Sequence, residues 1–348
     1  MQDINCQDIV KFDSLLETAS NITIVTHMKP DGDALGSSLA MYSFSCMIGK
    51  RCRIVLPHRY PANLSFLISM ECIDDIMIHE DAPAAAEEAI SSADLIICLD
   101  FNAFSRTDRL RQALESAVAK KVLIDHHLNP DRPSFDLIFS ETEISSASEL
   151  LYHILMEMPQ IKGDPSKLPS PAVNALMTGM TTDTNNFANS VYPSTFRMAS
   201  GLLEAGADRD TIISSLYNMF SESRLRLLGL ILKDLTTITE YGVAYIVLDS
   251  VTLKKYKVIE GDTEGFVNMP LSIKDVRMSI LVKEDEGLAR VSIRSKKGVS
   301  ANTCARMHFN GGGHENAAGG KLLIPDDISD ISCAGQYIEQ HTETFFNS

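Results

Sequence analysis

The sequence predicts an α/β protein in which an N-terminal parallel-sheet domain is followed by a helical linker and a smaller mixed α+β domain. Three observations predict this class. In the first half of the 348 residues, short apolar runs alternate with longer amphipathic stretches, as in parallel strands joined by helices. A helical pattern then extends from about residue 194 to 233. Beyond it, polarity alternates with the two-residue period of strands.

The N-terminal elements alternate in type along the chain. Apolar runs typical of buried strands occupy residues 21–26, 53–56, 94–99 and 121–124. Helical spacing of apolar residues is found at 33–48, 106–119, 146–157 and 171–179. Because such alternation produces parallel sheets with right-handed crossovers, we expect one sheet, with its ligand site beyond the carboxyl ends of the strands.

The second half changes character after residue 193. The helical stretch 194–233 is interrupted at Gly201 and Gly206, which favours a linker with candidate hinges. Strand patterns follow at 243–248, 278–283 and 289–294, then a helical stretch at 300–308, a glycine-rich segment and an amphipathic helix at 331–345. We therefore expect a catalytic domain at 1–193, a linker at 194–233 and a second domain at 234–348.

Composition and charge restrict the function. Hydrophobic residues make up 45% of the chain and charged residues 22%, which excludes collagenous and largely disordered proteins. A formal net charge of −15 disfavours a protein that grips long duplex DNA through its phosphates. Neither a signal-peptide pattern nor an apolar run near the ~20 residues of a membrane span is present. The seven scattered cysteines, Cys72 among them, form no CxxC pair, so we expect reduced thiols and a cytoplasmic protein.

Acidic and histidine side chains stand at four places where predicted elements end. They are His27, Asp31 and Asp33 after the first strand, Asp100 after the third, Asp125, His126 and His127 after the fourth, and Asp183 further along. In a parallel sheet the first three places project from the same edge. A single aspartate at a strand end usually caps a helix, as Asp33 could, so the inference rests on the joint occurrence.

Four of the five carboxylates in this set would repel one another in a common cleft: Asp31, Asp33, Asp100 and Asp183. At ~5 Å and an effective dielectric constant of about 20, each pair costs roughly 3 kcal/mol. Either several carboxylates are protonated or cations lie among them, and two divalent ions would cancel the four charges. Imidazoles beside carboxylates favour Mn²⁺, Fe²⁺, Co²⁺ or Zn²⁺ over Ca²⁺ and Mg²⁺. This is the arrangement of a two-metal hydrolase.

A segment near the C-terminus has the composition of an anion-binding loop. It contains Gly311, Gly312, Gly313 and His314. Consecutive glycines let backbone N–H groups converge on an anion, and the Ala-Ala pair at 317–318 could start a helix whose dipole adds to the attraction. The strand 289–294 ends nearby in Arg294 and Ser295, and the guanidinium of Arg294 suits a bidentate phosphate contact.

Taken together, these motifs resemble those of the DHH phosphoesterase superfamily. The matching stretches are HMKPDGDALGS from residue 27, the strand end at Asp100, DHH at 125–127, TTDT around Asp183 and GGGHENAAGG from residue 311. They are most similar to the stand-alone RecJ-like group with a C-terminal DHH-associated domain, the nano-RNases or oligoribonuclease/pAp phosphatases. The resemblance implies a parallel-sheet catalytic domain, a helical linker and a smaller substrate-binding domain that faces it across a cleft.

The resemblance also implies roles for individual residues. One Mn²⁺ would be held by His27, Asp31 and Asp100, and a second by Asp33, Asp100, His126 and Asp183, with Co²⁺, Fe²⁺ or Mg²⁺ as alternative ions. Asp125 would support the site, and His127 would contact the scissile phosphate or act as general acid. The terminal phosphate of the substrate would be held by Arg294, Ser295, His314 and the backbone of Gly311, Gly312 and Gly313.

The implied activity is hydrolysis of very short oligoribonucleotides and removal of the 3′-phosphate of pAp. Short RNA or nucleotides would be the partners, rather than long duplex DNA or a membrane, and a homodimer is one option for the assembly. Three alternatives stay open. They are a phosphodiesterase for cyclic or linear dinucleotides such as cyclic di-AMP and pApA, an exopolyphosphatase or pyrophosphatase, and a nucleotide-binding regulator without catalysis.

Overall fold

The computed structural model describes residues 4–68, 73–218, 220–259 and 261–347. The chain divides into two compact units, residues 1–219 and 220–348. Each unit has its own six-stranded sheet and its own hydrophobic core, so the two are described separately.

The first unit is built on a parallel sheet, as the alternation of apolar runs and helical patterns predicts. The strand order is β3-β2-β1-β4-β5-β6, and all pairs are parallel. The strands are β1 (Asn21–Val25), β2 (Arg51–Leu56), β3 (Ile76–Ile78), β4 (Leu95–Leu99), β5 (Lys120–Asp125) and β6 (Leu137–Ser140). Because β1, β4 and β5 are neighbours, the segments that follow them meet at one edge of the sheet.

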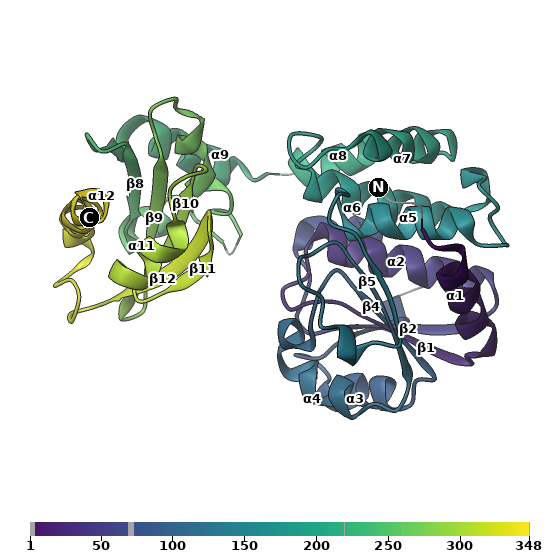
Figure 1. Cartoon of the computed structure of the whole chain (residues 1–348). Coiled ribbons are helices and arrows are strands. Elements are labelled where there is room, and N and C mark those ends of the chain that lie inside the picture. Colours follow the sequence, from purple (N-terminus) through teal and green to yellow (C-terminus); the bar gives the residue numbers. More distant parts are fainter. Residues whose placement is uncertain (1–3, 69–72, 219, 260, 348) are drawn as a thin grey trace. The chain divides into compact units, whose positions relative to one another are not determined.

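Helices cover both faces of this sheet (Figure 1). One face packs on α1 (Cys6–Thr18), α2 (Gly32–Met47), α5 (Ala147–Glu157) and α6 (Ser170–Asp183), and the other on α3 (Pro83–Ser91) and α4 (Arg111–Ser116). Burial on both faces explains why strands such as β4 are apolar throughout. Two further helices, α7 (Pro193–Glu204) and α8 (Arg209–Tyr217), pack against α6.

The sequence prediction lacks strands β3 and β6 and helices α1 and α3, and it differs from the structure in two further details. The stretch 106–119 is not one helix: a 3₁₀ segment, Phe104–Leu110, precedes α4, and Asp108 has a φ of +50° that interrupts the helical path. Gly201 does not break a helix but lies inside α7, where a Cβ would come within 2.4 Å of the Tyr152 hydroxyl. Gly206, with a φ of +92°, does lie beyond the end of α7.

The second unit is a smaller mixed α+β domain, as predicted. Its strand order is β11-β12-β10-β9-β8-β7, and only β8 and β9 pair in parallel among these neighbours. The strands are β7 (Thr236–Ile238), β8 (Val243–Leu248), β9 (Met278–Asp285), β10 (Leu288–Ser295), β11 (Gly312–His314) and β12 (Ala317–Leu323).

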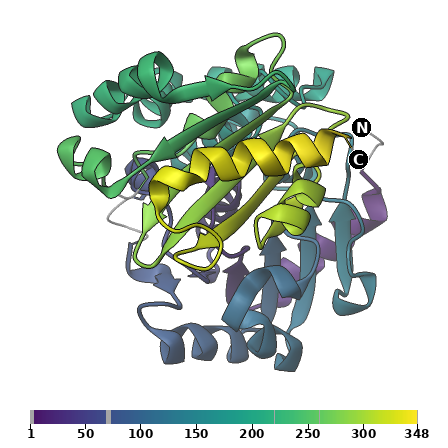
Figure 2. The same cartoon turned by 90° about the vertical axis from the view of Figure 1, so that its left-hand side faces the viewer.

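The helices of the second unit also cover both faces of its sheet. Helices α11 (Ala301–His308) and α12 (Ala334–Asn347) pack on one face, and Figure 2 shows α12 lying across the strands. Helix α9 (Glu222–Leu230) packs on the other face, and the short helix α10 (Ser250–Lys255) follows β8.

The glycine-rich segment forms a hairpin, so the prediction of a helix at 317–318 is wrong. Strands β11 and β12 pair there in antiparallel register. A Cβ on Gly311 would lie 1.9 Å from the carbonyl oxygen of Gly319, and one on Gly320 would lie 2.2 Å from that of Phe309. Close backbone approach therefore requires these glycines. Asn310 has a φ of +45°, a conformation that asparagine tolerates better than most residues.

Two expectations concern membranes and thiols. Among the described residues, no helix has both the length and the apolar character that crossing a membrane requires. The described cysteines form no disulfide, and Cys72 lies outside the described residues.

Candidate metal centre

The carboxyl ends of three neighbouring strands bring the predicted ligands together. His27 follows β1, Asp100 follows β4 directly, and His126 follows the last residue of β5. Asp183 reaches the same place from the end of α6. The backbone of Asp100 has a φ of +63°, a sparsely populated conformation that clusters at functional sites.

The amino end of α2 supplies two more carboxylates with different local roles. Asp31 is the N-cap of α2, since its Oδ1 accepts hydrogen bonds from the N–H groups of Asp33 and Ala34, both at 3.1 Å. The alternative that Asp33 caps α2 is therefore wrong. Asp33 is fully buried, and its two oxygens accept from the N–H groups of Ala147 at 2.6 Å and Ser148 at 2.9 Å, at the start of α5.

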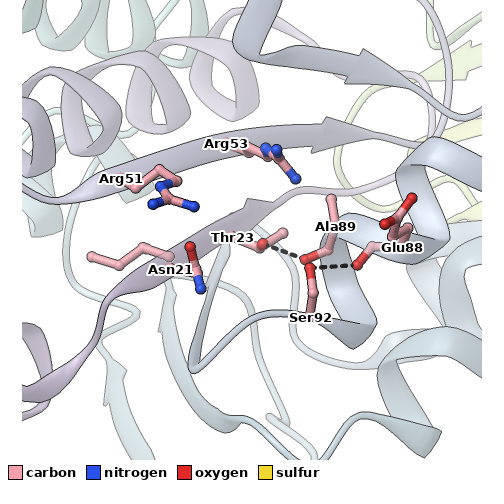
Figure 3. Close-up of a pocket in the computed structure, with 8 residues that line it drawn as sticks. Asn21, Thr23, Arg51, Arg53, Glu88, Ala89 and Ser92 are labelled. Carbon is pink, nitrogen blue, oxygen red and sulfur yellow. Dashed lines mark hydrogen bonds between the residues drawn. The ribbon is translucent and has the colours of Figure 1, made fainter.

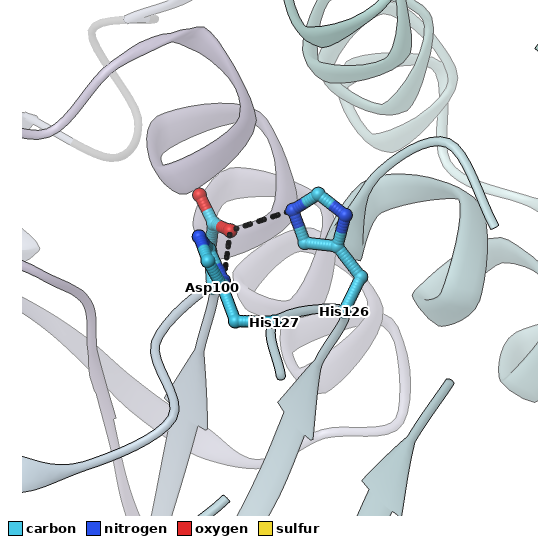
Figure 4. A group of neighbouring side chains, drawn as sticks. All are labelled: Asp100, His126 and His127. Atoms are coloured by element: carbon cyan, nitrogen blue, oxygen red, sulfur yellow. Dashed lines mark ion pairs between the residues drawn. The ribbon is translucent and has the colours of Figure 1, made fainter. Parts of the chain in front are cut away.

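Asp100 joins two groups of possible ligands. Its Oδ2 lies 3.3 Å from Nε2 of His27, which also faces Asp31 Oδ1 at 3.9 Å. Its Oδ1 lies 3.4 Å from Nε2 of His126 (Figure 4). The second group consists of His126, Asp183 at 3.4 Å and Asp33 at 4.0 Å. Within each group the candidate ligand atoms all lie within 4.8 Å of one another.

Hydrogen bonds within the site leave the right atoms for a cation. Nδ1 of His27 lies 2.9 Å from the carbonyl oxygen of Met28, so its proton points there, and Nε2 faces Asp100 and becomes a ligand atom once it has lost its proton. Oδ1 of Asp100 is buried without a hydrogen-bond partner among the described residues, which is costly unless a cation or another group compensates. The residues present therefore fit divalent metal ions.

The pKa shifts of the ligand side chains also favour bound cations at this site. Burial, followed by the charges of Asp100 and Asp183, raises the pKa of Asp33. Burial raises the pKa of Asp183 to about 7. Burial alone would lower the pKa of His126, but contact with Asp100 and nearby carboxylates raises it to about 10. Protons are thus retained where charge would otherwise accumulate, and a cation would replace them.

Asp100 behaves differently from the other carboxylates. Burial by itself would raise the pKa of Asp100, but the facing imidazoles of His126 and His27 outweigh it and hold that pKa well below its usual range. A carboxylate that stays ionised between two imidazoles is suited to bridge two cations.

Asp125 lies outside the groups of possible ligands, whereas His127 forms a third such group with Asp100 and His126. Asp125 is buried, and its Oδ1 lies 2.7 Å from Nδ1 of His127. The side chain of His127 is 34% exposed, and its Nδ1 lies 3.8 Å from Asp100 (Figure 4). The imidazole is therefore oriented by a buried carboxylate while part of its ring remains accessible.

The predicted substrate-binding residues all belong to the second unit. The guanidinium of Arg294 is half-buried and donates to the carbonyl oxygens of Ile293 at 2.9 Å and Ala318 at 3.4 Å. The hydroxyl of Ser295 is buried and donates to the carbonyl oxygen of Val299 at 2.6 Å. Ser295 therefore has a structural contact of its own, and its substrate role remains a prediction.

The glycine amides are also partly engaged within the second unit. The N–H of Gly311 donates to the carbonyl oxygen of Ala305 at 3.2 Å, and that of Gly313 donates to Oδ1 of Asn302 at 2.9 Å. An anion would have to compete with these two bonds. The backbone of His314 lies in β11, and its side chain lies outside the described residues.

Sequence reasoning did not identify the glycines that allow α2 and α6 to approach closely. A Cβ on Gly36 would lie 2.5 Å from the carbonyl oxygen of Ala175, and one on Gly179 would lie 2.8 Å from Oδ1 of Asp33. The two helices carry Asp33 and Asp183, so their separation determines the geometry of the second ligand group. The small residues of the DGDALGS motif were the available signal.

His58 was also missed. Its Nδ1 accepts a hydrogen bond from the N–H of Lys29 at 3.2 Å, and its Nε2 lies 3.4 Å from Oδ2 of Asp108. The loop that carries His27 and Asp31 is thus held from the end of β2. Only the position of His58 just after a predicted strand could have indicated this.

Comparison with known proteins identifies the class. Residues 21–180 match the model of the DHH family N-terminal domain, and residues 240–334 match the DHHA1 domain. The chain belongs to the DHH family of phosphoesterases. A relative from Thermus thermophilus is 30% identical, with 86% of this chain and 84% of that protein covered. A relative from Bacillus subtilis is 27% identical, with 93% and 95% covered. Both are named bifunctional oligoribonuclease and PAP phosphatase NrnA.

Solved structures share the same fold. An exopolyphosphatase-related protein from Bacteroides fragilis is 36% identical and superimposes with a TM-score of 0.89, covering 100% of this chain and 98% of that one. The exonuclease RecJ bound to manganese is 14% identical with a TM-score of 0.51, covering 100% and 96%. The RecJ-like architecture expected from the motifs is thereby confirmed.

Proposed function

We propose that this protein hydrolyses very short oligoribonucleotides and removes the 3′-phosphate of pAp with the help of two divalent cations, Mn²⁺ in the first instance. The observation that supports this most is the position of Asp100, whose two oxygens face His27 and His126 at 3.3 and 3.4 Å. The names of the relatives support the choice of substrate.

The proposed ligand sets follow the two groups around Asp100. His27, Asp31 and Asp100 would hold one ion, and Asp33, Asp100, His126 and Asp183 the other. When bound, such ions supply charge neutralisation at the phosphate and lower the pKa of a water nucleophile. The carboxylate of Asp33 is held in position for such an ion, because it accepts hydrogen bonds from two N–H groups at the start of α5.

His127 is proposed to transfer a proton to the leaving oxygen of the substrate. Asp125 accepts a hydrogen bond from Nδ1–H of His127 at 2.7 Å, and its charge would stabilise the imidazolium form. The proton on Nε2 would then pass to the oxygen released from phosphorus. In the second unit, Arg294, Ser295, His314 and the glycine backbone would contribute the contact to the terminal phosphate, with Arg294 as the cation.

The proposal is tested by comparing substrates under Mn²⁺. We expect hydrolysis of pAp and pApA, and much slower release of mononucleotides from a 24-mer RNA at equal concentration of ends. Equal turnover of the 24-mer would contradict the restriction to short substrates. Polyphosphate, pyrophosphate and cyclic di-AMP complete the panel, since one structural relative is named exopolyphosphatase-related. Hydrolysis of polyphosphate and of no other substrate in the panel would contradict the proposal and indicate an exopolyphosphatase.

A further inference from the structure

A cavity lies in the first unit, at the opposite end of the sheet from Asp100. It has a volume of about 250 Å³ and opens at the first residues of β1 and β2, Asn21 and Arg51. At about 3.3 Å per residue, the distance along β1 from the lining residue Thr23 to His27 is roughly 13 Å, and from Asn21 it is roughly 20 Å. The cavity is therefore distinct from the metal centre.

Two arginines form one side of this cavity. Arg51 and Arg53 are alternate residues of β2, so their side chains project from the same face of the sheet. They lie beside Asn21 and Thr23 in the parallel register of β1 and β2 (Figure 3). Across the described part of the chain, neither guanidinium has an ion pair or hydrogen bond, although the protein carries a net charge of −15. Two neighbouring unpaired cations at a concave site favour binding of an anion.

The wall of the cavity that faces the two arginines carries hydrogen-bond acceptors and negative charge. It is formed by the end of α3, where the hydroxyl of Ser92 donates to the carbonyl oxygen of Glu88 at 2.7 Å and the hydroxyl of Thr23 donates to that of Ala89 at 2.7 Å. Glu88 also lines the cavity, and a helix C-terminus carries partial negative charge. This wall would repel a bare anion and accept hydrogen bonds from hydroxyl or amino groups.

Among the described residues, no strand pairs with the first half of β2 on the side away from β1. Strand β3 pairs with residues 54–56 of β2, and no described strand lies beside Arg51 and Arg53 on that side. A small molecule therefore has an approach to the guanidinium groups. The volume of about 250 Å³ is near the lower end of small-molecule pockets, which span about 300–1,000 Å³, so it suits a compact ligand rather than an oligonucleotide.

We propose that this cavity binds a small phosphomonoester that carries hydroxyl groups, such as the ribose phosphate of a mononucleotide. Arg51 and Arg53 contact the phosphate, and Glu88 accepts hydrogen bonds from the hydroxyl groups. The base of a nucleotide is not needed for recognition. Ribose 5-phosphate and AMP both carry the phosphate and the hydroxyl groups that the cavity would bind.

The test is calorimetric titration of the full chain with ribose 5-phosphate, AMP, ribose and inorganic phosphate in the presence of EDTA. EDTA prevents metal-dependent binding at the Asp100 site, so the result does not depend on the proposed catalytic function. We expect ribose 5-phosphate and AMP to bind, with ribose and inorganic phosphate each at least tenfold weaker. The double variant R51Q/R53Q should lose at least tenfold in affinity for ribose 5-phosphate.

A matched double variant controls for charge. Arg132 and Arg197 are exposed and lie outside the cavity, so R132Q/R197Q should bind ribose 5-phosphate as the wild type does. Unchanged melting temperatures and Mn²⁺-dependent hydrolysis would show that both double variants are folded.

The proposal is overturned if neither phosphomonoester binds at millimolar concentration, if both double variants lose affinity equally, or if inorganic phosphate binds as tightly as ribose 5-phosphate. AMP binding tighter than ribose 5-phosphate identifies a nucleotide site, and equal affinities a sugar-phosphate site.

Discussion

Asp125 contacts His127 through both carboxylate oxygens. Oδ1 lies 2.7 Å from Nδ1 of the imidazole, and Oδ2 accepts a hydrogen bond from the backbone N–H of His127 at 3.1 Å. Backbone and ring are therefore fixed by the same buried group. The arrangement places the proton on Nδ1 and directs Nε2 away from Asp125, as a proton-transferring histidine requires.

Replacing Asp125 by asparagine should impair catalysis more than substrate binding. The amide cannot stabilise the imidazolium form of His127, so we expect kcat for pApA to fall about 10- to 100-fold with little change in KM. Steady-state kinetics with saturating Mn²⁺ measures this. Asp136→Asn, which removes an exposed ion pair with Lys120, is the control and should leave kcat unchanged. A wild-type kcat in Asp125→Asn would show that the contact between Asp125 and His127 does not contribute to catalysis.

Replacing Asp100 by asparagine should disrupt both ligand groups at once. The substitution keeps the size of the side chain but removes the charge that faces His27 and His126. We expect the Mn²⁺ affinity to fall at least about 10-fold and hydrolysis of pAp and pApA to approach background. Titration calorimetry with Mn²⁺ and product analysis check the two effects. Full turnover by Asp100→Asn would contradict the proposed ligand sets.

Metal binding should release protons and strengthen as the pH rises. With protein groups alone, the pKa of His126 is raised to about 10 and that of Asp183 to about 7, so both groups carry protons at slightly acidic pH. A metal ion binds the deprotonated forms and must displace these protons. Mn²⁺ titrations between pH 5.5 and 8, in buffers of different ionisation enthalpy, should show rising affinity and proton release. A pH-independent affinity would contradict this coupling.

The meeting of distant ligands could be predicted because it follows from the topology. Once β1, β4 and β5 are recognised as parallel strands, their carboxyl ends must share an edge, and Asp100 and His126 follow those ends directly. The same argument could not separate Asp31 from Asp33. Asp31 is the N-cap of α2 and Asp33 lies in its first turn. The role of Asp33 depends on a hydrogen bond from Ala147, a residue 114 positions away.

The hairpin of β11 and β12 was not predictable from local pattern for a different reason. Alanines at 317–318 have a high helix propensity, yet they lie in a strand. The backbone of Gly311 lies so close to Gly319 that only glycine fits, and the antiparallel pairing this allows outweighs the propensity. Spacing in the sequence shows the glycines but not which backbone atoms they approach.

The Gly36→Ala substitution should destabilise the first unit. The added Cβ would meet the backbone oxygen of Ala175 at 2.5 Å and the Cα of Gly179 at 3.1 Å. Since these are backbone atoms, the contact is relieved only by moving α2 away from α6, at a cost of about 1–3 kcal/mol. Urea unfolding measures this cost, and weaker Mn²⁺ binding should accompany it.

Gly229→Ala is the matched control for this substitution. Gly229 lies in α9, and a Cβ there has no atom within 4 Å. Alanine should therefore stabilise that helix by about 0.5–1 kcal/mol. If Gly36→Ala were as stable as the wild type, close packing of α2 on α6 would not be what positions Asp33 and Asp183.

Glu149 should make the stability of the first unit depend on pH. This carboxylate is buried and accepts hydrogen bonds from the hydroxyl of Thr195 at 2.7 Å and the N–H of Ser145 at 3.1 Å. Burial alone would raise the pKa of Glu149, but the contact with His153 and these hydrogen bonds lower it to about 2. A lowered pKa in the folded state means that the stabilisation is complete above pH 4.5, the ordinary value, and is lost as the pH falls toward about 2.

The variant Glu149→Gln separates this contribution from general acid denaturation. It keeps the shape but loses the charge-assisted hydrogen bonds, so we expect a loss of about 1.5–3 kcal/mol at pH 7. The difference from wild type should shrink at pH 3, because the wild-type carboxylate has by then lost part of its advantage. Glu157→Gln, at an exposed position in the last turn of the same helix, should match the wild type at both pH values. A difference for Glu149→Gln that stays constant from pH 7 to pH 3 would show that the side chain is not ionised in the folded protein.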